Sequence, residues 1–543
     1  MNHIELFAGC GGLSLGLETA GFDLLVANEL SPMASETFAY NHLGADLETQ
    51  SNCENVYWIS SQFERDKISL RLRENPVLAT GLSPDHTSDL KNKLPNEKLK
   101  RSLLVGSIVD INTLLEEKRW FRIALKSGLG TGDVDLVSGG PPCQSFSLAG
   151  LRDHTHHRNQ LPWEFAKFVE NVKPKIALLE NVSGILRPFK IEGEKFYAWY
   201  EVAKAFAKVG YIPLCLHVNA KYSGAAQNRP RFIMIAIRKD VLSSIKKSIA
   251  KDDPIRKIFE PSELLFKAVR NGDPEYGAVQ DFKCWDIEKD KSIFSNSLLK
   301  SLLSHPTEDT FVSVKDAIDD LHRFGEDESS YVNEINSLFS PHEGLEEILP
   351  INKENNHEER TNNNRVRARF RLYQIMSILD KSQVKEIYEF LKTKGQSNIS
   401  NSCLAELGKH WMLDVNGKLL SKPTATRIKG ILKDLHTKKQ TQKALIASLP
   451  APAALSIPDD ACHYYVDDKN QSTDTIRTLT VREMARIQSF PDWYRIRSKV
   501  TTGGQMRKFE VPQYTQIGNA VPPLLGFALG KVCRELLKAT DGK

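Results

Sequence analysis

Residues 4–12 read Ile-Glu-Leu-Phe-Ala-Gly-Cys-Gly-Gly, a short apolar run that meets a cluster of glycines. A helical spacing of apolar residues follows over 13–20, and a second apolar run over 22–27 begins just after Gly21. Short apolar runs predict buried strands, and glycines punctuate the connection between elements. The stretch therefore predicts a strand, a loop, a helix and a second strand.

Further apolar runs continue this pattern and end at Ser138, Glu180 and Ile237. Helical stretches such as 163–172 and 195–209 lie between them. Alternation of strands with helices predicts an α/β fold with a doubly wound, mostly parallel sheet. In such sheets ligands bind outside the carboxyl ends of the strands, so these ends are where we look for chemistry.

Two long stretches interrupt the alternation. Residues 45–105 are polar and rich in Lys, Asn and Ser, and we interpret them as an insertion that forms a partly helical surface excursion. Residues 239–475 carry charged, Asn-rich and Lys-rich segments, including the arginine-rich run 362–371. A chain of 543 residues exceeds the size of one core. The middle block is therefore expected to hold a second, irregular domain.

The last part of the chain regains a regular pattern. Thr480 and Glu483 have the spacing of a capping box, which predicts a helix that ends before Pro491. An apolar helix is expected from about 523 to 537, and we expect it to return to the first domain.

Composition restricts the class of protein. Lys and Arg total 73 against 68 for Asp and Glu, so the net charge is only +5 and a nucleic-acid surface must come from local clustering. The eight cysteines are scattered, which favours a reducing cytoplasm and argues against zinc or disulfides. The chain shows neither a leader nor a membrane-spanning run, so we expect a soluble, unprocessed protein.

The glycine cluster predicts a nucleoside site. Glu29 ends the second strand 22 residues after Phe7, where a carboxylate can accept both ribose hydroxyls. A pyrophosphate-binding loop would need a third glycine at position 14, which is Ser14 here, so NAD and FAD are disfavoured. S-adenosylmethionine fits better. The alternative is that the glycines only make a tight turn between strand and helix.

A cysteine lies in a stiff loop at the end of a strand. Residues 139–145 read Gly-Gly-Pro-Pro-Cys-Gln-Ser, and the prolines and glycines hold Cys143 in a fixed position. Such a thiol can act as a nucleophile when its environment favours the thiolate. The alternative is an inert, buried cysteine.

Two further motifs follow at neighbouring strands. Glu180 ends a strand, so its carboxylate should point to the same edge, although a capping or surface acid is the alternative. Arg229 and Arg231 precede the next strand two residues apart, which places them on one face if the chain is extended. A surface basic pair is the alternative for these arginines.

Together these groups suit one reaction. Cytosine C5 becomes nucleophilic when a thiolate adds at C6 while a carboxylic acid supports the proton at N3 and an arginine holds O2. Because C6 is buried in a stacked duplex, the base must be flipped out. The chemistry therefore predicts a separate region that grips DNA, and the middle block has a suitable size.

The order of these motifs resembles the cytosine-C5 DNA methyltransferase family of bacteria and phages from one terminus to the other. The matching segments are Phe7 to Gly12, Glu29, Pro142 with Cys143, Glu180 to Val182, Gln227 with Arg229 and Arg231, 477–483 with 488–491, and 516–523.

The resemblance implies a Rossmann-like methyltransferase fold that uses S-adenosylmethionine and no metal. It makes Cys143 the nucleophile and Glu180 the acid at N3, with Arg229 and Arg231 as active-site supports and Arg231 the better candidate for the base. The residues it implies for cofactor binding are Phe7, Gly9, Cys10, Gly11, Glu29, Ser107, Ile108, Pro142, Asn519 and Val521.

The resemblance also divides the chain. Residues 1–321 would form the catalytic domain, with 239–321 transitional because 314–321 resembles a helix attached to that domain. Residues 322–475 would recognise the DNA target, and 476–543 would return to the catalytic domain. The implied partner is double-stranded DNA, with a restriction endonuclease acting separately. We expect a monomer that associates with the nucleoid through DNA.

One motif departs from the family, and two rival functions remain. The third family motif usually reads Gly-Asp-Ile, with the aspartate on the adenine amino group, whereas residues 106–108 read Gly-Ser-Ile. Either Ser107 or Asp110 takes that contact. A transfer-RNA methyltransferase is one rival, but that branch carries a short middle block. A catalytically silent DNA-binding relative is the other, but Cys143, Glu180 and Arg231 are all present.

Overall fold

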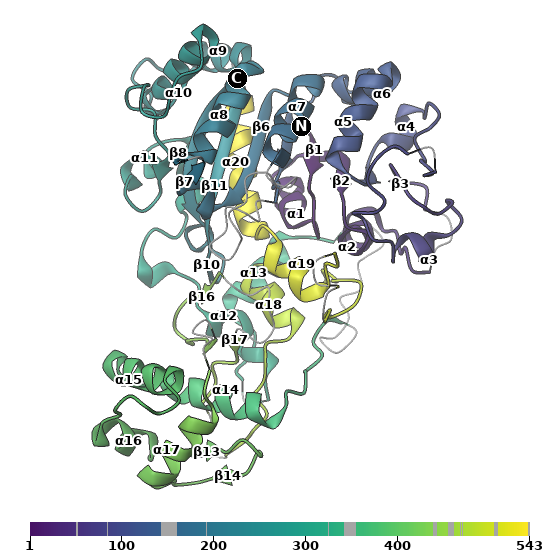
Figure 1. The fold of residues 1–543 in the computed structure, drawn as a ribbon. Helices are drawn as coiled ribbons and strands as arrows, with labels where there is room; N and C mark the ends of the chain where they lie inside the picture. Colours follow the sequence, from purple (N-terminus) through teal and green to yellow (C-terminus); the bar gives the residue numbers. More distant parts are fainter. Residues whose placement is uncertain are drawn as a thin grey trace.

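The computed structural model describes residues 1–49, 53–83, 85–142, 160–191, 193–323, 325–341, 355–437, 442–453, 461–466, 468–469, 471–503, 506 and 509–540 (Figure 1). The strands are β1 (Asn2–Leu6), β2 (Asp23–Glu29), β3 (Val56–Trp58), β4 (Ser102–Val105), β5 (Leu136–Gly139), β6 (Ile176–Val182), β7 (Phe189–Ile191), β8 (Glu194–Phe196), β9 (Tyr211–Asn219), β10 (Gln227–Asn228), β11 (Pro230–Arg238), β12 (Trp285–Asp286), β13 (Met412–Leu413), β14 (Leu419–Leu420), β15 (Lys443–Ala444), β16 (Ala451–Pro452) and β17 (Ala461–Cys462).

The α-helices are α1 (Gly12–Thr19), α2 (Pro32–Leu43), α3 (Ile68–Arg71), α4 (Asn96–Leu99), α5 (Ile108–Glu117), α6 (Arg119–Lys126), α7 (Leu161–Val172), α8 (Ala198–Lys208), α9 (Lys239–Ser248), α10 (Pro254–Asn271), α11 (Lys291–Ser295), α12 (Val314–Ile318), α13 (Ser330–Leu338), α14 (Asn364–Met376), α15 (Lys381–Lys392), α16 (Asn401–Leu407), α17 (Ala425–Asp434), α18 (Val481–Ile487), α19 (Gln513–Asn519) and α20 (Pro523–Lys538). Among the described residues, none of these helices is long and apolar enough to cross a membrane.

The centre of the fold is a nine-stranded sheet with the order β12-β9-β11-β6-β5-β1-β2-β4-β3. The pairs from β3 across to β6 are parallel, whereas β11 runs antiparallel to both β6 and β9. The sheet is therefore doubly wound and mostly parallel, as the sequence predicts. Its parallel strands are buried on both faces, which is why they read as continuous apolar runs.

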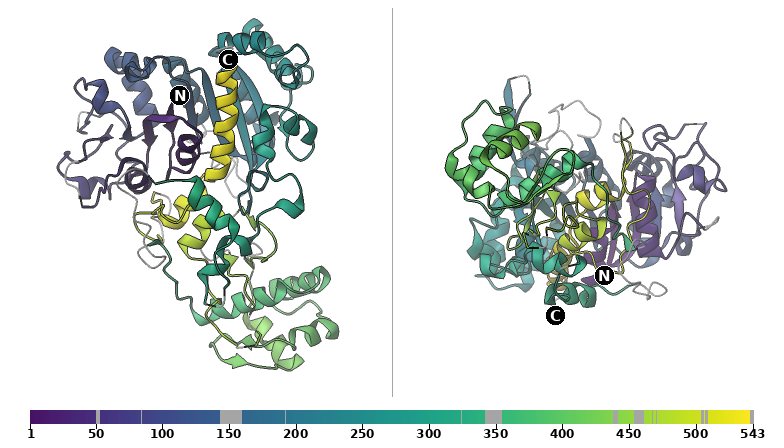
Figure 2. Two further views of the ribbon diagram at one scale, coloured as in Figure 1. Left: turned by 180° about the vertical axis from the view of Figure 1, so that it is seen from behind. Right: turned by 90° about the horizontal axis from the view of Figure 1, so that it is seen from below.

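Helices cover both faces of the sheet. Helices α5, α7, α8 and α10 form a contiguous layer on one face. Helices α1 and α20 pack against each other on the opposite face, where the view from behind shows them in front of the strands (Figure 2). The C-terminal helix thus returns to the first domain, as expected.

The insertion, residues 45–105, contributes a strand to the central sheet, which its sequence does not indicate. It contains the two short helices α3 and α4, which agrees with a partly helical segment, but it also supplies β3 as an edge strand paired with β4. Val56 and Trp58, on one face of β3, join a core with α2 and β2, whereas Tyr57 on the other face joins the main core. Strand β9 was not predicted, because Pro213 and His217 interrupt its apolar run.

Two further cores lie beyond the sheet. One combines α12, α13, α18 and α19 and reaches back to Cys10 and Leu15. The Thr480 capping box is present at the start of α18, as predicted. The other core is formed by residues between Ala368 and Ile476, mainly from α14 to α17. The predicted boundaries at 322 and 475 stay predictions.

Candidate active site at the carboxyl edge of the sheet

The predicted acid and one of the predicted arginines form an ion pair at the carboxyl end of β6. Strand register places Glu180 opposite Ile233 and Arg231 opposite Val182, so Glu180 and Arg231 are diagonal neighbours on one face. Arg231 Nε lies 2.7 Å from Glu180 Oε1, and both side chains are nearly buried. Burial lowers the pKa of Arg231, and the Glu180 carboxylate opposes this shift. The pair is thus a charged group held inside the protein at the sheet edge.

The loop after β5 begins against this pair. A Cβ on Gly140 would lie 2.8 Å from Glu180 Oε2, so only glycine permits this approach. Asn181 Nδ2 donates a hydrogen bond to the carbonyl oxygen of Pro141 at 3.0 Å, which fixes the loop where it leaves the strand. Pro142 follows and is exposed. The predicted nucleophile, Cys143, lies outside the described residues.

The second predicted arginine has different partners. Arg229 Nη2 donates to the carbonyl oxygens of Gly518 at 2.8 Å and Ala520 at 2.9 Å. It is buried, and burial together with the charge of Arg231 lowers its pKa well below the ordinary value. The two arginines therefore have different partners, since Arg231 pairs with Glu180 and Arg229 with the C-terminal segment. The catalytic role predicted for Arg229 stays a prediction.

The residues predicted to bind the nucleoside, Glu29 at the end of β2 and Gly9 after β1, lie beside an open space. Gly9 N donates to Glu29 Oε2 at 2.9 Å, and Ser31 N donates to Glu29 Oε1 at 2.7 Å. Burial raises the pKa of Glu29, and these backbone hydrogen bonds partly offset the shift. A Cβ on Gly9 would meet no atom within 4 Å, and Phe7 adopts a left-handed φ of 55°. A carboxylate fixed beside such a space fits a ribose, so these residues suit the nucleoside of S-adenosylmethionine.

The neighbouring glycines serve the packing of the protein. A Cβ on Gly12 would lie 2.2 Å from the carbonyl oxygen of Val521, and one on Gly11 would lie 2.3 Å from His42 Nε2. A side chain at either position would therefore collide with the protein itself. Contact of Gly11 with a cofactor stays a prediction. Val521 is nearly buried in this contact, whereas Asn519 is exposed at the end of α19.

Two other residues of the predicted cofactor set can be placed. Cys10 is buried, its thiol donates to the carbonyl oxygen of Gln516 at 3.6 Å, and burial raises its pKa to about 12. Ile108 is the first residue of α5 and is buried in the main core. Contact of these residues with a cofactor stays a prediction.

The departure from the family motif lies beside the insertion. Ser107 Oγ accepts a hydrogen bond from Val109 N at 3.1 Å and caps α5. Asp110 Oδ2 accepts one from Gly81 N, within the insertion, at 3.0 Å. Both side chains are nearly buried and engaged with the protein, so the choice between them stays open. Gly81 could not be predicted from the sequence, because Asp110 is distant along the chain and a glycine indicates only a turn.

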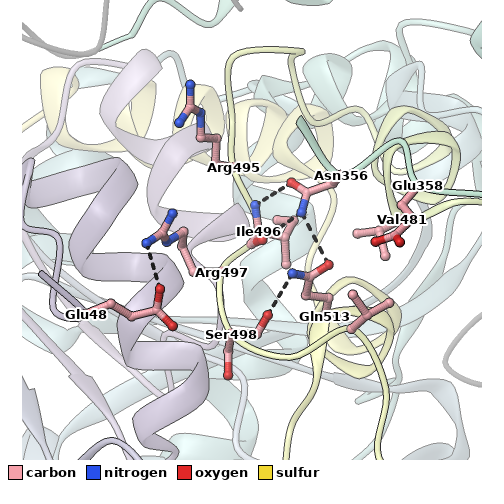
Figure 3. A pocket seen from close by; sticks show the side chains of 10 residues that line it. Glu48, Asn356, Glu358, Val481, Arg495, Ile496, Arg497, Ser498 and Gln513 are labelled. Carbon is pink, nitrogen blue, oxygen red and sulfur yellow. Dashed lines mark hydrogen bonds and ion pairs between the residues drawn. The ribbon is translucent and has the colours of Figure 1, made fainter. Parts of the chain in front are cut away.

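A cavity of about 210 Å³ lies away from all of these groups (Figure 3). Its lining side chains are joined by hydrogen bonds, such as Gln513 Nε2 to the Ser498 carbonyl at 2.8 Å, and by the ion pair of Arg497 with Glu48 at 3.2 Å. It contains none of the predicted catalytic or cofactor-binding residues. We therefore do not assign the reaction to it.

The doubly wound sheet, with a buried ion pair and an open space beside Gly9 at its carboxyl edge, defines a Rossmann-like α/β enzyme. The chain belongs to the family described as C-5 cytosine-specific DNA methylase, whose model matches residues 1–61 and 110–535. The unmatched gap, 62–109, falls mostly within the insertion and includes the altered motif at Ser107.

Relatives of known type cover nearly the whole chain. The type II methyltransferase M.DdeI of Desulfomicrobium norvegicum is 25% identical over 98% of this chain and 88% of its own length. The type II methyltransferase M.AgeI of Thalassovita gelatinovora is 25% identical over 98% of this chain and 99% of its own length. A solved structure from E. coli, described as a DNA modification methyltransferase encoded within a prophage, has 19% identity and a TM-score of 0.46, with 99% of both chains covered.

Proposed function

We propose that this chain transfers a methyl group to C5 of a flipped-out cytosine in double-stranded DNA, through a covalent bond between Cys143 and C6. The observation that carries the proposal is the Glu180–Arg231 ion pair, which lies against the loop leading to Cys143. The family supports methyl transfer to DNA, and the roles of individual residues are our proposal.

The ion pair has the donors and acceptors that a cytosine needs. Glu180 Oε1 is held by Arg231, while Oε2 lies on the side of Gly140, toward the loop that precedes Cys143. Arg231 uses Nε for Glu180 and Nη1 for the Pro230 carbonyl, so among the contacts of the described residues Nη2 remains as a donor for cytosine O2. The side-chain amide of Asn181, tied to Pro141, keeps these groups in register with the loop.

The steps follow from these positions. Cys143 thiolate adds to C6 while Glu180 holds a proton at N3, and the electron pair of the C5–C6 double bond shifts so that C5 becomes an enamine carbon. When bound, S-adenosylmethionine supplies an electrophilic methyl group. Once C5 carries the methyl group, loss of the C5 proton to a base and departure of the Cys143 thiolate restore the aromatic ring. Phe7, Gly9 and Glu29 would hold the cofactor beside this site.

Arg229 has a positioning role in this proposal. Its guanidinium holds the carbonyl oxygens on both sides of Asn519 and also approaches the carbonyl oxygen of Ala453 at 3.4 Å. It thereby joins the start of β11 to the C-terminal segment that resembles a cofactor-binding motif. Arg229 would act through Asn519 and Val521 without touching the base.

We also propose how the chain recognises DNA and what role it has in the cell. We propose that residues 322–475 recognise the DNA target, which the separate core between Ala368 and Ile476 supports. Because M.DdeI and M.AgeI are named type II methyltransferases, we propose that this chain protects DNA in a restriction–modification system or is a solitary relative. It would act as a monomer in the cytoplasm, bound to DNA.

A trapping experiment tests the proposal. Duplex DNA that contains 5-fluorocytosine cannot lose the C5 substituent as a proton, so we expect a covalent complex with wild-type protein and S-adenosylmethionine. Cys143→Ala should form no complex and reduce methyl transfer to background. The control Cys284→Ala removes a half-buried thiol from a different part of the sheet and should retain activity.

The substrate class is tested in the same assay. Duplex DNA and transfer RNA are offered with labelled S-adenosylmethionine, and sequencing for 5-methylcytosine then gives the modified base and its context. Label in RNA alone would overturn the proposal, and so would full turnover by Cys143→Ala.

A further inference from the structure

A short hairpin follows the strand that carries Glu180. After β6, the 3-10 turn Ser183–Leu186 leads into β7, which pairs antiparallel with β8. Phe189 lies opposite Phe196, and Lys190 lies opposite Lys195. Successive side chains of a strand point to opposite faces, so the hairpin has a phenylalanine face and a lysine face.

The two faces have different surroundings. The phenylalanine rings contact each other with centroids 5.1 Å apart, and they pack against the main core. The two lysines are exposed, and no ion pair to either is found among the described residues. Glu194, the neighbouring acid on β8, belongs to the phenylalanine face by alternation. Like charges directly opposite each other destabilise an antiparallel pair, so the fold gains nothing from two lysines at this rung.

The hairpin lies on the side of the molecule where DNA would have to enter. Because β7 begins shortly after Val182, it starts from the carboxyl edge that carries Glu180 and Arg231. Figure 1 shows β7 and β8 next to the lower part of β11. Seen from below, the hairpin projects on the same side as the helices α14 to α17 (Figure 2). A duplex held by that domain would run past the lysine face.

We propose that Lys190 and Lys195 bind the phosphate backbone of the DNA next to the target cytosine. The inference rests on the proposed function, since it takes DNA as the substrate. Directly opposite Cβ atoms in an antiparallel pair are about 5 Å apart, and two flexible lysine stems can spread from there to neighbouring phosphates on one strand. This contact is independent of base sequence and sets the position of the duplex.

Salt dependence provides the first test. Each neutralised phosphate adds about 0.9 to the slope of log affinity against log salt concentration, so Lys190→Gln/Lys195→Gln should lower that slope by about 2. The KM for duplex DNA should rise, and kcat at saturating DNA should stay unchanged. The matched control Lys247→Gln/Lys251→Gln removes two exposed charges at the opposite edge of the sheet and should leave the slope unchanged.

Charge reversal separates binding from folding. Lys190→Glu places an acid opposite Lys195, so the melting temperature should stay the same or rise while DNA affinity falls further than in Lys190→Gln. An unchanged salt slope in the double variant would overturn the proposal, as would loss of thermal stability in Lys190→Glu. If wild-type protein fails to methylate DNA in the same assay, the proposed function fails instead.

Discussion

Arg231 at the sheet edge and the arginines of α14 differ in the partners of their guanidinium groups. Arg231 contacts Glu180 at the edge, and no hydrogen bond of its Nη2 is found among the described residues. In α14, Arg365 donates to the carbonyl oxygen of Asp434 at 2.6 Å, and Arg369 donates to that of His436 at 2.9 Å. These carbonyls lie at the C-terminal end of α17, where cations satisfy unpaired acceptors.

A third arginine of α14, Arg371, also uses its guanidinium for contacts within the protein. Arg371 is fully buried, donates to the Trp411 carbonyl oxygen at 3.0 Å, pairs with Asp468 and lies 4.0 Å from the Trp411 ring centroid. The run 362–371 has the composition of a nucleic-acid-binding segment, yet three of its four arginines hold the domain together. A basic cluster therefore indicates DNA contact only where the fold leaves its charges without internal partners.

The largest effect is expected at the sheet edge. Glu180→Gln keeps the size of the side chain but removes the acid, so kcat should fall by roughly 10²- to 10⁴-fold, the contribution of a positioned acid–base group. Single-turnover methyl transfer measures the change, and binding of duplex DNA should be much less affected. A variant with wild-type kcat would show that the edge pair is structural, like the pairs of α14.

The opposite result is expected in α14. Arg371→Met removes a buried cation and its hydrogen bonds, so the free energy of unfolding of this domain should fall by about 2–4 kcal/mol. Thermal unfolding followed by limited proteolysis between 364 and 476 measures the loss, and kcat of the folded fraction should persist. Arg367→Met is the control, because Arg367 is half-buried on the same helix and has no ion pair among the described residues. Equal destabilisation of both variants would contradict the comparison.

The proximity of two residues at the ends of adjacent strands could be predicted from the sequence. Contacts between residues that are far apart along the chain could not. Glu180 and Arg231 are placed by the two-residue period of adjacent strands, so their proximity follows from the strand pattern. Arg229 shares that spacing, but its partners Gly518 and Ala520 come from the far end of the chain. The same holds for Gly12 and Val521. The packing of α1 against α20 brings Gly12 to Val521, two segments that the sequence gives no reason to pair.

A smaller effect is expected on the pH dependence of stability, and it comes from Glu5 in the central sheet. Glu5 on β1 is buried, accepts a hydrogen bond from Ser14 Oγ, and burial raises its pKa to about 8. The folded protein therefore binds a proton at Glu5 over a pH range in which the unfolded chain, with a carboxyl pKa near 4.5, has lost it. The stabilisation from this group is complete below pH 4.5 or so and is lost as pH rises toward 8.

Glu5→Gln removes this titration while keeping a hydrogen-bond acceptor for Ser14. Between pH 5 and pH 8 the free energy of unfolding of the wild type should fall relative to that of the variant, by about 2–4 kcal/mol in total. Urea unfolding of both proteins at several pH values gives the difference directly. Glu29 and Glu36, whose pKa values are also raised by burial, titrate in both proteins and so cancel in that difference. If the difference in the free energy of unfolding between the two proteins stays constant with pH, Glu5 is ionised in the folded state. The sheet would then contain a buried charge, as α14 does at Arg371.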